Sequence, residues 1–199
     1  GVGVMGKSMV RNLNKAGYHI TIFTRTKSKV NDLINEGIDW CNSIQECVQN
    51  KDIIMTMVGY PKDVEDIYYG NHGILENAKE NAICIDFTTS APALAQKIYT
   101  DAKIRNIKSL DAPVSGGDIG AKNGTLSIMV GGDKNVYEDV YPLFQILGQT
   151  INYVGQAGLG QHTKMTNQIV IAGTIAGVVE AIHYAHQTGL ETDTMMKCI

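Results

Sequence analysis

Apolar positions along the first 155 residues alternate between strand spacing and helical spacing. Strand patterns lie at residues 18–24, 52–58, 82–87, 108–111, 125–130 and 150–154. Helical patterns lie between them, at residues 6–17 and 26–37, from 43, from 61, from 90, and at 133–147. A regular alternation of this kind predicts a doubly wound α/β sheet.

Local signals mark several of these boundaries. Residues 52–58 (DIIMTMV) are almost unbroken apolar, which is typical of a parallel strand covered on both faces. Ser43 with Glu46 forms a capping box at a helix start. Pro61 begins the next helix, and Ser90 with Pro92 is expected to cap and start the one after it.

The pattern changes after Gly155. One long helical segment runs from about Gln161 to Thr188 and is closed by Gly189, with no strand in it. We therefore predict an α/β domain over residues 1–156 and the start of an all-helical second domain over 157–199. We expect the chain to be part of a longer one, with a strand before Gly1 in the centre of the sheet and further helices after Ile199.

Composition narrows the class of protein. The 199 residues are 44% hydrophobic with a formal charge of −3, so no broad basic face is expected and nucleic acid is excluded as a partner. Four cysteines without a C-x-x-C pair favour a reducing compartment, the cytoplasm. The most apolar run, residues 169–179, is interrupted by glycine and threonine, so we expect no membrane span.

The first six residues, GVGVMG, fit the pattern G-x-G-x-x-G. Gly1 allows a tight turn, Gly3 lets the backbone approach a pyrophosphate, and Gly6 lets the helix pack closely on its strand. With Val4 and Met5 these glycines form a candidate dinucleotide loop, and a helix and a strand of suitable length follow it.

The end of that following strand bears on which nucleotide binds. NAD sites usually place an acidic residue there for the ribose 2′-hydroxyl, whereas this chain has TRTKSK at residues 24–29. The hydroxyls and cations favour a 2′-phosphate, so NADP is preferred over NAD. The residues assigned to this role are Thr24, Arg25, Thr26 and Lys29.

Two further segments carry chemistry. Residues 111–117, DAPVSGG, follow a strand, and on a loop Ser115, Gly116 and Gly117 could form a nest for a carboxylate. Residues 160–168, GQHTKMTNQ, place Lys164, Asn167 and Gln168 on one helical face. A lysine beside an apolar segment loses its charge more readily than an exposed one.

Together the glycine loop, TRTKSK, DAPVSGGDIGAKNGTLSIMVGG and GQHTKMTNQ resemble the β-hydroxyacid dehydrogenase family, which includes 3-hydroxyisobutyrate dehydrogenases and tartronate-semialdehyde and glyoxylate reductases. The resemblance covers essentially the whole chain. It implies a Rossmann-like domain and a homodimer or homotetramer. It also implies that Met57, Val58 and Thr89 line the nicotinamide side of the cofactor.

The resemblance further implies roles for the polar residues. Lys164 would be the catalytic general acid/base, with no metal required, and Ser115, Gly116 and Gly117 would hold the substrate carboxylate. Asn167 and Gln168 would place the reacting group. The expected substrate is a small 3-hydroxy acid or aldehyde acid: 3-hydroxyisobutyrate, tartronate semialdehyde, glyoxylate or succinic semialdehyde. The alternatives are an imine reductase and a non-catalytic NADP-binding scaffold.

Overall fold

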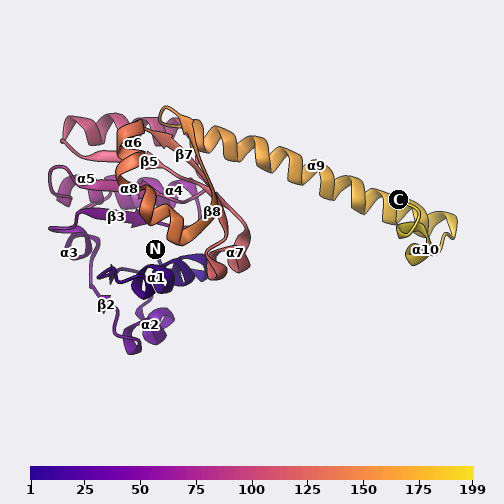
Figure 1. Ribbon diagram of the computed structural model, residues 1–199, viewed down its shortest axis with the longest axis horizontal. Coiled ribbons are helices and arrows are strands. Elements are labelled where there is room, and N and C mark those ends of the chain that lie inside the picture. Colours follow the sequence, from indigo (N-terminus) through magenta and orange to yellow (C-terminus); the bar gives the residue numbers. More distant parts are fainter. The chain divides into compact units, whose positions relative to one another are not determined.

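The computed structural model describes residues 1–199 and divides into two compact units, residues 1–164 and 165–199. The strands of the first unit are β1 (Thr21–Ile22), β2 (Asp39–Trp40), β3 (Ile53–Thr56), β4 (Ile83–Asp86), β5 (Lys108–Asp111), β6 (Val114–Ser115), β7 (Leu126–Gly132) and β8 (Gly148–Gly155). Its helices are α1 (Val4–Lys15), the 3₁₀ turn η1 (Lys27–Val30), α2 (Asn31–Asn35), α3 (Ile44–Val48), α4 (Pro61–Tyr69), α5 (Ile74–Asn77), α6 (Pro92–Ile104), α7 (Gly117–Asn123) and α8 (Lys134–Leu147) (Figure 1).

The strands form two sheets. β3, β4 and β5 are parallel neighbours, and β7 joins β5 in the antiparallel sense, pairing β6 on the same path and β8 alongside. β1 and β2 form a separate parallel pair. The main sheet is therefore mixed, and its parallel part brings the carboxyl ends of β3, β4 and β5 to one edge.

Both faces of the main sheet are covered by helices, as a doubly wound fold requires. On one face Ile85 and Leu110 pack with Met9 of α1 and Phe144 of α8. On the other face Cys84 and Ile54 belong to a core built by α3, α4, α5 and α6. Successive residues Cys84 and Ile85 thus point to opposite cores, which explains why the strand patterns are almost continuously apolar.

The expected elements are present, with three corrections. The hydroxyl of Ser90 does not cap α6: the N-cap residue is Ala91, and Ser90 Oγ is buried without a hydrogen-bond partner. The segment after Asp111 is not an irregular loop, because Val114–Ser115 pairs with β7 and α7 follows. The expected strand at residues 18–24 is shorter, with only Thr21–Ile22 paired.

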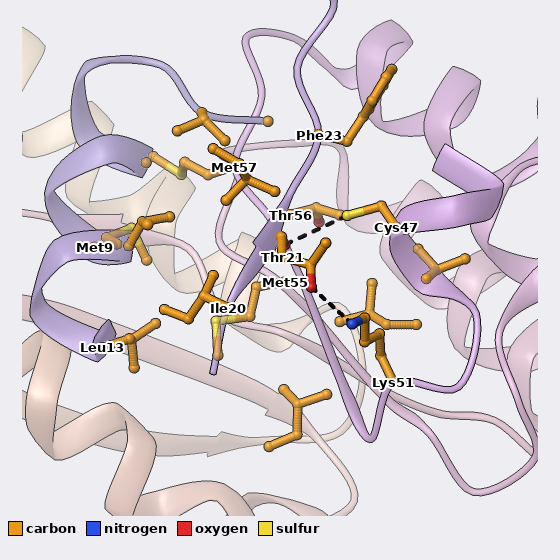
Figure 2. Close-up of a pocket in the computed structure, with 18 of the residues that line it drawn as sticks. Met9, Leu13, Ile20, Thr21, Phe23, Cys47, Lys51, Met55, Thr56 and Met57 are labelled. Atoms are coloured by element: carbon orange, nitrogen blue, oxygen red, sulfur yellow. Dashed lines mark hydrogen bonds between the residues drawn. The ribbon is translucent and has the colours of Figure 1, made fainter. Parts of the chain in front are cut away.

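A cavity of about 520 Å³ lies between β1 and β3, next to α1. Figure 2 shows side chains that line it, among them Met9, Leu13, Ile20 and Met55. β1 pairs with β2 and β3 with β4, while the sides of β1 and β3 that face the cavity pair with no strand. The cavity occupies the place where we expect a strand before Gly1.

The second unit contains the larger part of α9 (Leu159–Thr188) and the short helix α10 (Thr192–Met196). Gly189, with a φ of +72°, ends α9, as the sequence predicts, and Glu191 accepts hydrogen bonds from the N–H groups of Asp193 and Thr194 to cap α10. By length and composition alone α9 is long and apolar enough to cross a membrane. The sequence-based expectation differs because it required an unbroken apolar run, whereas an average over the helix tolerates Gly173 and Gly177.

Candidate functional site

The glycine loop has the shape that a dinucleotide requires. A Cβ on Gly1 would lie 2.6 Å from the carbonyl oxygen of Met57, and a Cβ on Gly6 would lie 2.7 Å from the carbonyl oxygen of Gly1. A Cβ on Gly3 would meet nothing within 4 Å. Gly1 and Gly6 therefore permit close packing inside the protein, while the backbone at Gly3 is open to a ligand.

Helix α1 also leaves donors for a phosphate. Its N-cap residue is Gly3, which has no side chain to accept the N–H groups of the first turn, and no acidic residue lies in that turn. Unsatisfied N–H groups and the positive end of the helix dipole suit an anion. The residues present, Gly1 to Gly6 with Val4 and Met5 between them, fit a dinucleotide pyrophosphate.

The basic segment after β1 lies at the start of η1 and is largely exposed. The Arg25 side chain is 83% exposed and contacts Asp63 at 3.2 Å, and Lys27 lies over the ring of Trp40. Thr24 is half-buried, whereas Thr26 and Lys29 are exposed. Hydroxyls and cations are thus available on one short segment, with Arg25 shared between Asp63 and solvent.

The carboxyl ends of β3 and β4 are connected by a buried network that sequence reasoning missed. Thr56 Oγ1 donates to Asp86 Oδ1 at 2.7 Å, and the N–H of Thr88 donates to the same oxygen at 3.1 Å. The Val58 N–H in turn donates to Thr88 Oγ1 at 3.0 Å. This network fixes the segments that carry Met57, Val58 and Thr89, of which Thr89 is exposed and the other two are half-buried.

Burial raises the pKa of Asp86 to about 6, and the hydrogen bonds from Thr88 and Thr56 partly oppose the shift. The sequence alone gives little sign of this group, because Asp86 stands at the end of an apolar run like any strand-terminal polar residue.

Lys164 and Ser115, which lie 49 positions apart in the sequence, meet in the structure. Lys164 Nζ donates to Ser115 Oγ at 2.8 Å. Lys164 is only 7% exposed, and burial lowers the pKa of its ammonium group. An amine held beside a hydroxyl, with its charged form disfavoured by burial, is suited to proton transfer.

Gly116 and Gly117 follow Ser115 with φ of +127° and +62°. Only glycine adopts the first of these readily, and Gly116 is the N-cap of α7. Ser115, Gly116 and Gly117 therefore lie at a strand end followed by a helix start rather than on a loop, and both glycines are exposed.

Asn167 and Gln168 belong to the second unit, where they are part of α9. Asn167 Nδ2 donates to Gln168 Oε1 at 3.2 Å. Asn167 is half-buried and Gln168 is exposed.

Two more buried polar residues were not predicted from the sequence, Asp111 and Gln161. The Asp111 carboxylate accepts the N–H groups of Gly158 and Gln161, at 2.7 and 2.9 Å. The Gln161 side chain bonds to the main chain at Ser90 and Thr88, at 2.8 Å each. The sequence signal is that each lies within a motif, Asp111 as the first residue of DAPVSGG and Gln161 as the second of GQHTKMTNQ.

Comparison with known proteins gives matches along the whole chain. Residues 1–155 match the family described as the NAD binding domain of 6-phosphogluconate dehydrogenase. Residues 158–199 match the family described as "NAD-binding of NADP-dependent 3-hydroxyisobutyrate dehydrogenase".

Curated relatives align over nearly the full chain. An uncharacterized oxidoreductase of Bacillus subtilis is 51% identical over all 199 residues, which cover 69% of that protein. An NAD-dependent L-serine dehydrogenase of Pseudomonas aeruginosa and a 2-hydroxy-3-oxopropionate reductase of Escherichia coli are each 36% identical, over 98% and 96% of this chain and 65% of each relative. The chain spans 60–69% of the length of the first curated relatives it matches.

Solved structures share the fold. A Mycobacterium tuberculosis 3-hydroxyisobutyrate dehydrogenase with L-serine superposes with a TM-score of 0.91 at 30% identity, covering all of this chain and 67% of that one. An imine reductase from Myxococcus stipitatus in complex with NADP⁺ superposes with a TM-score of 0.89 at 20% identity, covering all of this chain and 68% of that one, and this likeness concerns the fold alone.

Proposed function

The chain belongs to the β-hydroxyacid dehydrogenase family, and we propose that the protein of which it is part transfers hydride between NADP(H) and a small carboxylate-bearing 3-hydroxy acid or aldehyde acid. The observation that carries this proposal is the 2.8 Å contact between Lys164 Nζ and Ser115 Oγ at a buried position. This contact brings together the two motifs that the sequence offers for chemistry.

The nicotinamide ring, when bound, supplies or accepts the hydride. Lys164 then moves the proton: as ammonium it donates to the substrate oxygen on which negative charge develops during reduction, and as free amine it takes the hydroxyl proton during oxidation. The lowered pKa of Lys164 makes the amine form available at lower pH than for an exposed lysine.

Ser115, Gly116 and Gly117 are proposed to hold the substrate carboxylate. Ser115 Oγ accepts from Lys164 Nζ at 2.8 Å, which places this hydroxyl next to the group proposed to move the proton. Asn167 and Gln168 are proposed to orient the reacting group.

NADP rather than NAD is supported by the exposed guanidinium of Arg25 and by the hydroxyls and cations around it, with no acidic residue at residues 24–29. A relative at 36% identity is named for NAD dependence, so the preference has to be measured directly.

The apolar surface of α9 supports a homodimer or homotetramer as the assembled form. Ile171, Ile175 and Val178 recur at helical spacing and are 41–59% exposed, an arrangement that usually meets a partner surface. The four free cysteines support the cytoplasm as the compartment.

The first test follows NADPH oxidation by the complete protein with glyoxylate, tartronate semialdehyde, succinic semialdehyde and methylmalonate semialdehyde, with NADH in parallel. We expect turnover with one aldehyde acid and higher kcat/KM with NADPH. Binding of NADPH without turnover on any aldehyde acid would favour the imine reductase or the scaffold, and a cyclic imine substrate then separates these two.

Lys164→Ala is expected to lower kcat by about 10³-fold or more, because the proton donor is lost. NADPH binding, measured by fluorescence titration, should change little because Lys164 contacts Ser115 and not the glycine loop. A mutant with a rate close to that of the wild type would overturn the role of Lys164.

A further inference from the structure

The position of Lys164 depends on how the first turn of α9 is fixed to the sheet. α9 begins at Leu159, and Lys164 lies only five residues into it. The N–H groups of the first turn of a helix have no partner within the helix and are satisfied from outside. The structure shows which groups satisfy them.

Asp111 caps α9 from the end of β5. Asp111 is buried, with 5% of its surface exposed. Its two carboxylate oxygens accept separate hydrogen bonds: Oδ1 accepts the N–H of Gly158 at 2.7 Å, and Oδ2 accepts the N–H of Gln161 at 2.9 Å. A carboxylate at a helix N-terminus also interacts favourably with the helix dipole. The burial of Asp111 is thereby compensated by directed bonds to one helix.

The main chain around Asp111 is packed so closely that only glycine fits at two positions. A Cβ on Gly160 would lie 2.5 Å from the carbonyl oxygen of Met129 and 2.6 Å from that of Asp111. A Cβ on Gly131 would lie 2.7 Å from Asp111 Oδ1. The first turn of α9 therefore rests directly on the main chain of β5 and β7, with glycine at both points of closest approach.

Gln161 ties the same turn to the loop between β4 and α6. Its side chain is fully buried, its Oε1 accepts the Ser90 N–H at 2.8 Å, and its Nε2 donates to the Thr88 carbonyl oxygen at 2.8 Å. The two bonds flank Thr89, one of the residues expected beside the nicotinamide. Glutamine suits this position because its amide offers one acceptor and one donor side by side.

Ser115, the partner of Lys164, follows Asp111 by only four residues. The segment that begins at Asp111 therefore holds both partners: Asp111 fixes the helix that carries Lys164, and β6 carries Ser115. Gln161 adds the loop of Thr89 to the same frame.

We propose that Asp111 and Gln161 are positioning residues, which together fix Lys164 relative to Ser115 and to the segment Thr88–Ser90. This inference rests on the proposed function, since it assigns to Lys164 the proton transfer that these contacts would align. A misplacement of about 1 Å at a proton-transfer group can cost on the order of 10²-fold in rate.

Gln161→Glu gives the most specific test. A protonated glutamic acid can still accept from the Ser90 N–H and donate to the Thr88 carbonyl, whereas an ionised one presents an oxygen to that carbonyl. In the complete protein, kcat for reduction is measured with NADPH saturating, from about pH 6 to about pH 8.5, and expressed per molecule that binds NADPH, so that unfolded protein does not count.

We expect the ratio of kcat between Gln161→Glu and wild type to be close to one at the acidic end and to fall about tenfold or more as the glutamate ionises, while KM for the aldehyde acid changes less than threefold. A pH-independent ratio would overturn the role of Gln161. The proposed function is tested separately by the wild-type enzyme, which must reduce an aldehyde acid with NADPH before any ratio can be measured.

Asp111→Asn tests the cap, with Asp133→Asn as its matched control. Asp133 is the N-cap residue of another helix, α8. Its Oδ1 accepts a hydrogen bond of 2.6 Å from Tyr99 OH, so it is bonded to neither Lys164 nor Ser115 there. Asp111→Asn is expected to lower kcat about tenfold or more and to shift the lysine limb of the pH profile, because an asparagine side chain has one oxygen where two N–H groups need acceptors, so the first turn of α9 is held less firmly. Equal kcat and pH profile in the two variants would overturn the role of Asp111.

Discussion

Lys164 is a residue whose chemistry follows from its burial. An exposed lysine titrates near 10.4, and the lowered pKa of Lys164 means that its free amine appears at lower pH. In oxidation, which needs the amine, the rate should rise with pH and reach its plateau at a lower pH than an exposed lysine would give. In reduction, which needs the ammonium, the rate should fall over the same interval. Steady-state pH profiles in both directions check this, and profiles that do not mirror each other would contradict a shared group.

Asp86 gives a second prediction at the residue scale, concerning stability. Its pKa is about 6 in the folded protein and 3.8 in its ordinary state, so the stability it contributes is present below about pH 4 and is lost as the pH rises to about 6. Asp86→Asn keeps an oxygen for the bonds from Thr56 and Thr88 but carries no charge.

We therefore expect Asp86→Asn to melt a few degrees higher than wild type at about pH 8, with the difference shrinking towards about pH 4. Thermal unfolding of the complete protein across this range measures it. A difference in melting temperature that stays constant with pH would show that the titration of Asp86 is not its cause.

Residues differ in how far the sequence reveals them. Lys164 and Ser115 stand in motifs with helical spacing and strand-end glycines, so both could be named, and the resemblance supplied their roles. Asp86, Asp111 and Gln161 matter through contacts with residues 2 to 73 positions away. No periodicity records such contacts, because they arise only when strand ends and helix starts are brought to one edge.

At the scale of the element, the glycine loop separates packing from ligand binding. A Cβ on Gly3 meets no protein atom within 4 Å, whereas one on Gly6 would press on the main chain at Gly1. We expect Gly3→Ala to leave the melting temperature almost unchanged while weakening NADPH binding about tenfold or more, because a methyl group would stand between the backbone and the pyrophosphate.

Gly6→Ala is the matched variant and should lower stability by roughly 1–3 kcal/mol through overpacking. Calorimetry and NADPH titration on both variants measure the two effects separately. A Gly3→Ala protein that binds NADPH as tightly as wild type would show that the loop does not hold the pyrophosphate.

Elements were predictable where a local signal was strong. Residues 108–111 and the helix ending at Leu147 match the structure almost residue by residue, and the long helix before Gly189 does so as well. Short elements such as β2, β6, α5 and α7 were missed, because two to seven residues carry too little periodicity. The Ser90 cap failed for a different reason: the Ser90 N–H is bonded to Gln161, and the chain begins α6 one residue later.

At the scale of the whole molecule, the cavity between β1 and β3 separates the two sheets. The Asp52 and Thr56 carbonyls accept the N–H groups of Ile83 and Phe87, so by alternation the main-chain groups of Ile53 and Met55 face the cavity. The cavity walls are largely apolar, as Figure 2 shows for Met9, Leu13 and Met55. An extended apolar segment leading into Gly1 would satisfy the main-chain groups and fill the space, joining the two sheets.

We therefore expect a chain extended before Gly1 by about six residues of valine and isoleucine to unfold at a temperature at least several degrees higher than residues 1–199 alone. The amides of Ile53 and Met55 should become protected from hydrogen exchange. A control extension with proline at its centre cannot complete the ladder and should give neither effect, because proline has no N–H. Equal melting temperatures and equal exchange for the two extensions would mean that the cavity does not accept a strand.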